Sequence, residues 1–201
     1  GVNESGPGTT GRLTAYLTEK YGYRCIEFPY KPVNIFTAEI RVSDLASQLY
    51  QWTVHILKSK KSDLQDSDFE NVNYITHSFG ALIVYRMLME GPFTLKVGQL
   101  HMIAPAMPVH TPWDLASMHF NQATCYSNPR DFATMIGSLS HIIAPKMGLA
   151  GNLGFSSQMV DTNLRYSWKG PFNHSRPWFD EEGLEYLGEK IYEQNHEHKH
   201  N

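Results

Sequence analysis

The amino-acid sequence predicts an α/β domain in which helices flank a mostly parallel sheet. Strand patterns and helix patterns alternate along most of the chain. The 201 residues, 41% of them hydrophobic, suit one domain with a buried core that spans residues 1–201. Polar residues directly follow several predicted strands, and the carboxyl ends of parallel strands are where such folds gather functional groups.

The first third of the chain contains two predicted helices with one strand between them. Thr9 or Thr10 can cap a helix that Gly22 is placed to end. Residues 24–28 (RCIEF) then have the composition of a short strand. Ser43 can cap an amphipathic second helix, whose apolar residues recur at helical spacing. The charged stretch that follows this helix is predicted to be a solvated connection.

Alternation continues through the middle of the chain. Residues 72–76, 99–103 and 123–126 are predicted strands, and residues 79–89 form a strongly apolar helix between the first two. A short helix can begin after Thr111, since proline follows it at the first helical position.

The last third carries two predicted helices, a loop and a strand. We expect a helix over residues 132–143, a glycine-rich loop over 145–157 and a strand over 160–166. Asp180 can cap a final helix with an apolar inner face. The tail, residues 195–201, is expected to be frayed.

Charge and composition exclude several classes of function. The net charge of −3 argues against nucleic acid as a partner, because phosphate binding needs a basic face. No apolar run is long enough to be a transmembrane segment. The histidine-rich tail lacks a second ligand cluster, so neither a metal nor another cofactor is predicted. Cys25 and Cys125 do not form a CxxC pair, and we expect both to be free thiols.

One motif points to a reaction. A predicted strand runs into Thr76-His77-Ser78-Phe79-Gly80, and a helix begins at once. This arrangement resembles the nucleophile elbow of α/β-hydrolases, G-x-S-x-G, with threonine in place of the first glycine. Small residues on both sides of the serine allow strand and helix to approach closely. The alternative interpretation is a serine that only caps a helix.

The resemblance to α/β-hydrolases implies the partners of Ser78. The family's order is serine, acid, histidine, with the base after the last strand, which corresponds to His174. The acid corresponds to Asp131, which follows a strand and a turn, with Asp114 and Asp161 as rivals. In this family the histidine takes the serine proton and the carboxylate holds the histidine tautomer.

The resemblance also implies an oxyanion hole. The backbone N–H of Phe79 is expected to supply one donor, and Val2, in the glycine-containing opening of the chain, the second. The alternative for Val2 is a flexible terminus. The family places a central strand ahead of this loop, and no such strand occurs in the sequence. We therefore expect the domain to lack its N-terminal strand or strands.

The function implied is hydrolysis of carboxylic esters through an acyl-enzyme, with a small-molecule or lipid ester as substrate. Met107, Trp113 and Met147 can line an apolar acyl pocket, or they can be ordinary core residues. Two alternatives stay open. The same residues serve thioesterases and amidases, and the fold also hosts binding proteins without catalytic activity.

Overall fold

A sheet of four parallel strands forms the centre of the molecule. The structure, a computed structural model, describes residues 9–30, 33, 35–131, 148–164 and 174–197. Within these residues the strand order is β1-β2-β3-β4, so that consecutive strands are neighbours. The strands are β1 Tyr74–His77, β2 Val97–Ile103, β3 Phe120–Ser127 and β4 Asp161–Leu164. The predicted α/β class with a parallel sheet is confirmed.

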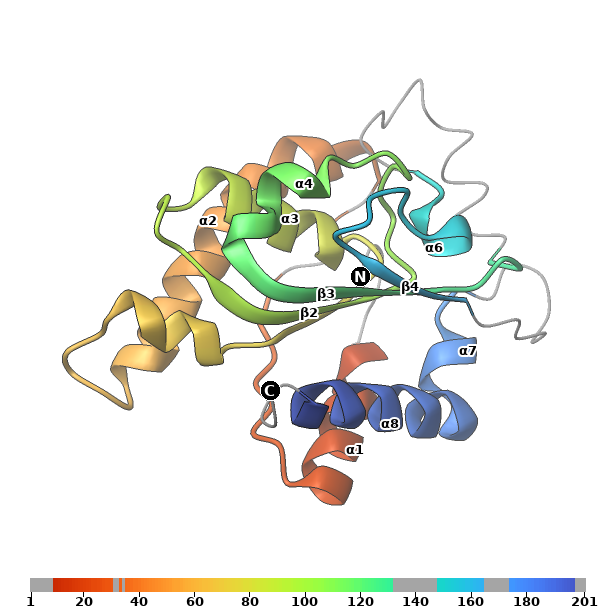
Figure 1. Cartoon of the computed structure of the whole chain (residues 1–201), viewed down its shortest axis with the longest axis horizontal. Coiled ribbons are helices and arrows are strands. Elements are labelled where there is room, and N and C mark those ends of the chain that lie inside the picture. The colour runs from red at the N-terminus through yellow and green to blue at the C-terminus, as the bar shows by residue number, and fades with distance from the viewer. Residues whose placement is uncertain (1–8, 31–32, 34, 132–147, 165–173, 198–201) are drawn as a thin grey trace.

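Helices cover both faces of this sheet (Figure 1). One face carries α2 (Ile35–Lys58), α3 (Gly80–Glu90), α4 (Trp113–Ala116) and α6 (Ala150–Leu153). The other face carries α1 (Thr9–Tyr21), α7 (Arg176–Phe179) and α8 (Glu181–Glu197). Two short 3-10 helices, η1 (Asp66–Asn71) and η2 (Ser117–His119), lie in the connections.

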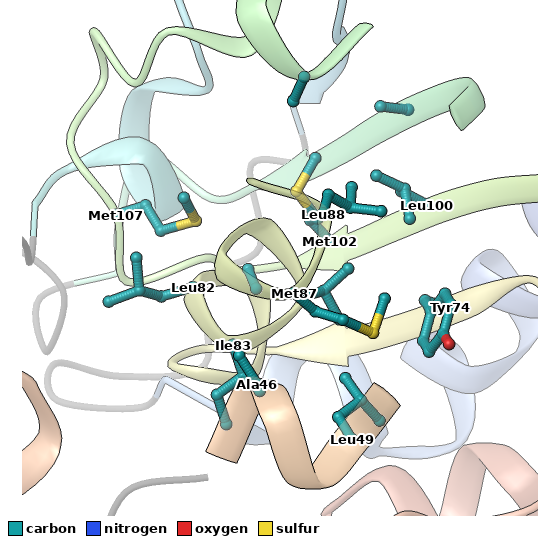
Figure 2. Close-up of a cluster of buried hydrophobic side chains, with 14 of the residues drawn as sticks. Ala46, Leu49, Tyr74, Leu82, Ile83, Met87, Leu88, Leu100, Met102 and Met107 are labelled. Atoms are coloured by element: carbon teal, nitrogen blue, oxygen red, sulfur yellow. The ribbon is translucent and has the colours of Figure 1, made fainter. Parts of the chain in front are cut away.

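Each face of the sheet has its own apolar core. On the α3 face, Ile83 and Met87 belong to the same buried cluster as Leu100 and Met102 of β2 (Figure 2). On the other face, buried residues of α1 and α8 cluster around Tyr126 of β3. All seven residues of β2 are buried, because a central strand covered on both faces has no solvent-facing side.

Most helices that the sequence predicts are present, and two of their ends have the predicted chemistry. Gly22 follows α1 with a φ of 70°, a left-handed conformation that glycine adopts at no steric cost. The carboxylate of Asp180 accepts a hydrogen bond of 2.9 Å from the backbone N–H of Gly183, which caps α8. α3 matches its prediction to within a residue at each end.

The strand predicted at residues 24–28 is wrong, because the structure has irregular backbone there. Tyr23, Cys25 and Phe28 are half-buried while Arg24 and Ile26 are exposed, so some alternation is present. A strand, however, requires a hydrogen-bonded neighbour, and β1, the sheet edge, pairs only with β2 among the described residues.

The predicted start of the second helix is also wrong. α2 begins at Ile35, and Ser43 lies inside it, where its hydroxyl donates a hydrogen bond to Glu90 at 3.0 Å. Ala38 and Val42, both buried, continue the apolar stripe of this helix toward its N-terminus. The packing of that stripe outweighs the preference of serine for a cap, which is a weak signal.

The expected fraying of residues 195–201 is wrong in part. α8 continues to Glu197, and Asn195 accepts a hydrogen bond of 2.9 Å from the Asn73 side chain. Residues 198–201 lie outside the described residues, as do the predicted helix over 132–143 and the end of the strand predicted over 160–166. The loop predicted over 145–157 contains the short helix α6.

Cys25 and Cys125 are both free thiols, as predicted. The prediction placed both in strands of one sheet. Cys125 does lie in β3, whereas Cys25 lies in the irregular segment. Across the described part of the chain, no helix has the length and apolar character needed to cross a membrane.

A buried histidine links β2 to β3. His101 is 1% exposed, and its two ring nitrogens lie 3.2 Å from the Gln99 side chain and 3.2 Å from the Tyr126 hydroxyl. Burial lowers the pKa of His101 to about 4, because a charged imidazolium would lose its hydration there. The folded protein therefore holds this ring neutral.

We expect the free energy of unfolding to fall as the pH falls from about 6.5 to 4. The unfolded chain binds a proton at His101 near its ordinary pKa of 6.5, whereas the folded chain does not until about 4. The loss from this group is roughly 3 kcal/mol. Urea unfolding at pH 7 and pH 4.5 measures it. His101→Gln should flatten this slope, and an unchanged slope in that variant would contradict the assignment.

Candidate active site

Ser78 stands in a strained turn between β1 and α3. Its φ is 54°, and only one other non-glycine residue of the described chain, Ala104, has a positive φ. Such a conformation costs roughly 1–3 kcal/mol, and it persists only where surrounding structure enforces it. Here the Ser78 N–H donates to Ile103 at 3.0 Å, and the Ser78 carbonyl accepts from Ala106 at 3.2 Å. The last residue of β2 and Ala106 beyond it thus hold the turn from outside.

The turn explains why threonine is tolerated where the elbow motif has glycine. A Cβ atom added at Gly80 would lie 3.5 Å from Cβ of Thr76, an ordinary contact distance. Positions 76 and 80 therefore face each other across the turn. Even a Cβ atom at position 80 would fit beside Thr76, so the turn accommodates threonine at position 76.

The strain at Ser78 predicts a measurable effect on stability. Ser78→Gly should be more stable than Ser78→Ala by about 1 kcal/mol, since glycine adopts positive φ without a Cβ clash. Chemical denaturation of both variants measures the difference. Equal stability, or a more stable alanine variant, would contradict the strained geometry.

Asp131 is held in a turn that follows β3. Its carboxyl side chain is 1% exposed. The Asp131 N–H donates to the Asn128 carbonyl at 2.9 Å, and Asn128 also accepts from the Arg130 N–H through its side chain. From α6, the Asn152 amide donates to the Asp131 carbonyl at 2.7 Å. The loop is therefore fixed by its own turn and by a neighbouring helix.

His174 reaches this carboxyl group across 43 positions of sequence. Its Nδ1 lies 2.5 Å from Oδ2 of Asp131, and its side chain is 19% exposed. A carboxylate at Nδ1 favours the tautomer in which Nδ1 carries the proton. Nε2 then has the lone pair that a base requires.

His77 joins this pair to the serine turn. Its ring centroid lies 4.7 Å from that of His174, and Phe179 of α7 packs edge-on against it at 5.1 Å. Because His77 precedes Ser78 directly, this contact places His174 beside the turn. Burial lowers the pKa of His77 well below its ordinary range, and charge on His174 lowers it further. His77 thus stays neutral beside His174.

Two groups at the turn remain available to a ligand. Among the described residues, the Ser78 hydroxyl makes no hydrogen bond, and neither does the backbone N–H of Phe79. Ser78 is 7% exposed, so its surroundings are largely protein. A hydroxyl and a free N–H, adjacent in sequence at a strand end, can contact the same group of a bound molecule.

The other predicted site residues lie either outside the described residues or in the apolar core. Val2 and Met147 lie outside the described residues. Met107 and Trp113 are both fully buried members of the core on the α3 face. Trp113 packs edge-on against Tyr85 at 5.0 Å. Neither residue lines the cavity of about 610 Å³ that lies beside β1, and their role beside an acyl chain stays a prediction.

Sequence reasoning missed two contributors to this site. The elbow motif gives His77 no role beyond the turn, but its ring lies against His174. Asn152 lies in a segment predicted to be loop, yet it anchors the Asp131 turn. For His77, its place next to the serine was an available signal. For Asn152 no local signal existed, because its partner lies 21 positions away.

The arrangement has the chemical parts of acid–base-assisted nucleophilic attack. A carboxylate orients a histidine, and that histidine lies beside a turn whose serine hydroxyl has no hydrogen bond among the described residues. The groups follow β1, β3 and β4, at the carboxyl ends of the strands. Within the described ranges, no cluster of histidine, cysteine and acidic side chains is suited to hold a metal ion.

The chain was compared with known protein families, curated proteins and solved structures. No protein-family model, no curated protein and no solved structure matched the chain.

Proposed function

We propose that the chain is a serine hydrolase with an α/β-hydrolase fold, which cleaves carboxylic esters through an acyl-enzyme. One observation carries the proposal. The turn at Ser78 has a positive φ, and the His174–Asp131 pair lies beside it. Strained turns of this kind cluster at active sites. Ordinary helix capping does not require such strain.

In this mechanism Ser78 is the nucleophile and His174 the base. Nε2 of His174 accepts the hydroxyl proton as Oγ attacks the ester carbonyl carbon, forming a tetrahedral intermediate. The intermediate collapses with release of the alcohol, to which His174 returns the proton. Water then attacks the acyl-enzyme in the same way, and the carboxylic acid leaves. Asp131 stabilises the imidazolium that forms in each half of the reaction.

The free N–H of Phe79 supports a role in stabilising the oxyanion. It is next to the nucleophile, and in the described residues it has no acceptor of its own. A preorganised donor of this kind contributes roughly 3–4 kcal/mol to transition-state stabilisation. The backbone N–H of Val2 is the proposed second donor.

Labelling with a fluorophosphonate probe tests the proposal directly. The probe forms a covalent bond only with an activated serine, so the intact chain should be labelled and Ser78→Ala should not. Ser43→Ala is the matched control, because Ser43 lies on α2 with its hydroxyl bonded to Glu90. Absence of labelling in the folded, intact chain would favour a binding protein without catalytic activity.

A series of p-nitrophenyl esters, thioesters and amides of matched acyl length then defines the substrate class. Esters are expected to give the highest kcat/KM. A preference of ten-fold or more for the thioester would assign the same residues to a thioesterase.

A further inference from the structure

His77 and His174 pack ring against ring beside the turn that carries Ser78. Their ring centroids lie 4.7 Å apart, and the two planes are inclined by 34°. His77 is the last residue of β1 and is only 4% exposed, whereas His174 lies in the segment that precedes α7. The contact therefore joins the strand that leads to the serine with the segment that carries the proposed base.

The sheet fixes the backbone of His77. His77 is paired with Ile103 of β2 in the parallel ladder, and the N–H of the next residue, Ser78, donates to the Ile103 carbonyl at 3.0 Å. The Cα atom of His77 thus keeps one position relative to the serine. A buried side chain in a close-packed interior has few rotamers open to it, so the direction of the His77 ring follows from its backbone.

A second ring limits the movement of His77. Phe179 of α7 lies perpendicular to it, with 87° between the two planes and 5.1 Å between the centroids. Phe179 is 2% exposed and belongs to the apolar cluster on the α8 face of the sheet. Edge-to-face pairs of this kind are favourable beyond the area that they bury. His77 thus contacts the core through Phe179 and the proposed base through its own ring.

The hydrogen bond to Asp131 does not by itself fix the plane of His174. It places Nδ1 of His174 at 2.5 Å from Oδ2 of Asp131. A single hydrogen bond has a broad angular preference at the acceptor, so the imidazole can still tilt about this contact. Nε2 lies away from the contact and moves when the ring tilts. The ring of His77, which lies against His174, restricts that tilt.

The contact also requires an uncharged residue at position 77. Burial lowers the pKa of His77 well below its ordinary range, and charge on His174 lowers it further. In the proposed mechanism His174 becomes an imidazolium, with Asp131 as its counter-charge. A neutral ring at position 77 packs against that imidazolium without adding a second positive charge beside it.

We propose that His77 is a positioning residue, which holds the imidazole plane of His174 so that Nε2 faces the Ser78 hydroxyl. The inference rests on the function proposed for Ser78 and names the residue that relates the base to the nucleophile. His77 exchanges no proton in this role, and only its flat ring is required. A ring fixed by the strand of the serine thus sets the place of a base that comes from a distant segment.

The test compares one variant that keeps a flat ring with one that does not. His77→Leu places an apolar side chain without a planar face, whereas His77→Phe keeps a ring without nitrogen atoms. His77→Leu should lower kcat for a short p-nitrophenyl ester by about 10²-fold, the effect of a small misplacement of reacting groups. KM should stay within about threefold, because ground-state binding is not affected. His77→Phe should recover kcat to within about fivefold of the intact chain, the remainder reflecting the larger ring.

Tyr74→Leu is the matched control for a general loosening of β1. Tyr74 (Figure 2) is buried at the start of the same strand, and its hydroxyl lies 2.8 Å from that of Thr53 in α2. This variant should lose stability in urea unfolding. It should keep kcat within about threefold, because Tyr74 lies at the other end of β1 from His77 and substitutions at separated sites act independently.

NMR relaxation of His174 provides a readout that does not need catalysis. The order parameter of its Cε1–H bond reports how tightly the ring is held on the picosecond to nanosecond timescale. It should fall in His77→Leu and stay near the value of the intact chain in His77→Phe and in Tyr74→Leu. Phe179→Leu, a second variant that removes the support of His77, should lower the order parameter too and reduce kcat by about tenfold.

The outcomes separate this inference from the proposed function. An unchanged kcat and order parameter in His77→Leu, with Ser78 still labelled by the fluorophosphonate probe, would overturn the positioning role and leave the hydrolase proposal standing. A loss in His77→Phe as large as that in His77→Leu would show that the nitrogen atoms are required, and would also overturn it. If the intact chain is not labelled, the hydrolase proposal fails, and an unchanged order parameter in His77→Leu would then overturn the positioning role separately.

Discussion

Ser78→Ala is expected to lower kcat for a short p-nitrophenyl ester by about 10⁴-fold to 10⁶-fold. In the proposed mechanism the effect is this large because the nucleophile, base and acid act as a unit, so that the loss of one leaves the others without a function. KM should change little, since the hydroxyl contributes to attack more than to ground-state binding. Initial rates at saturating ester measure both constants.

The control for this substitution is Ser43→Ala, which should keep the activity of the intact chain. Circular dichroism spectra should be the same for all three proteins. Turnover in Ser78→Ala close to that of the intact chain would show that Ser78 is not the nucleophile. The strained turn would then need a different explanation.

Asp131→Asn should reduce kcat by about 10⁴-fold, the size of effect seen when a triad carboxylate becomes an amide. The amide can donate a hydrogen bond to Nδ1, which favours the wrong tautomer of His174 and leaves Nε2 protonated. The isosteric change keeps the volume of this buried side chain, so we expect the fold to persist. The pH dependence of kcat is the diagnostic measurement.

Two acidic residues serve as matched controls. Asp114 accepts a hydrogen bond from Ser157, and Asp161 accepts one from Gln122, so neither is bound to His174. Asp114→Asn and Asp161→Asn should therefore retain activity within a few-fold of the intact chain. A large loss in either variant, with activity preserved in Asp131→Asn, would contradict the assignment of the acid.

The elements that the sequence predicted well are those controlled by neighbouring residues. α3 and the end of α1 were predicted because apolar periodicity and glycine conformation act over a few positions. The turn at Ser78 belongs to this group, since a strand, a serine, a glycine and a helix follow one another without interruption. The acid and base were predicted differently, through a resemblance to a family's order of residues.

Predictions failed where the outcome depended on a distant partner. Residues 24–28 have strand composition, but composition cannot supply a neighbouring strand. Ser43 is a good cap by residue type, but the packing of Ala38 and Val42 against the core extends α2 beyond it.

The sequence by itself determined the alternation of strands and helices and the sharp turn that carries Ser78. Only the tertiary structure decided that Asp131 and His174 meet, because their contact depends on the order of β3 and β4 in the sheet. The same holds for the His77–His174 contact and for the cavity beside β1. Local patterns reflect the energies of near neighbours, whereas these contacts join residues whose proximity is created by folding.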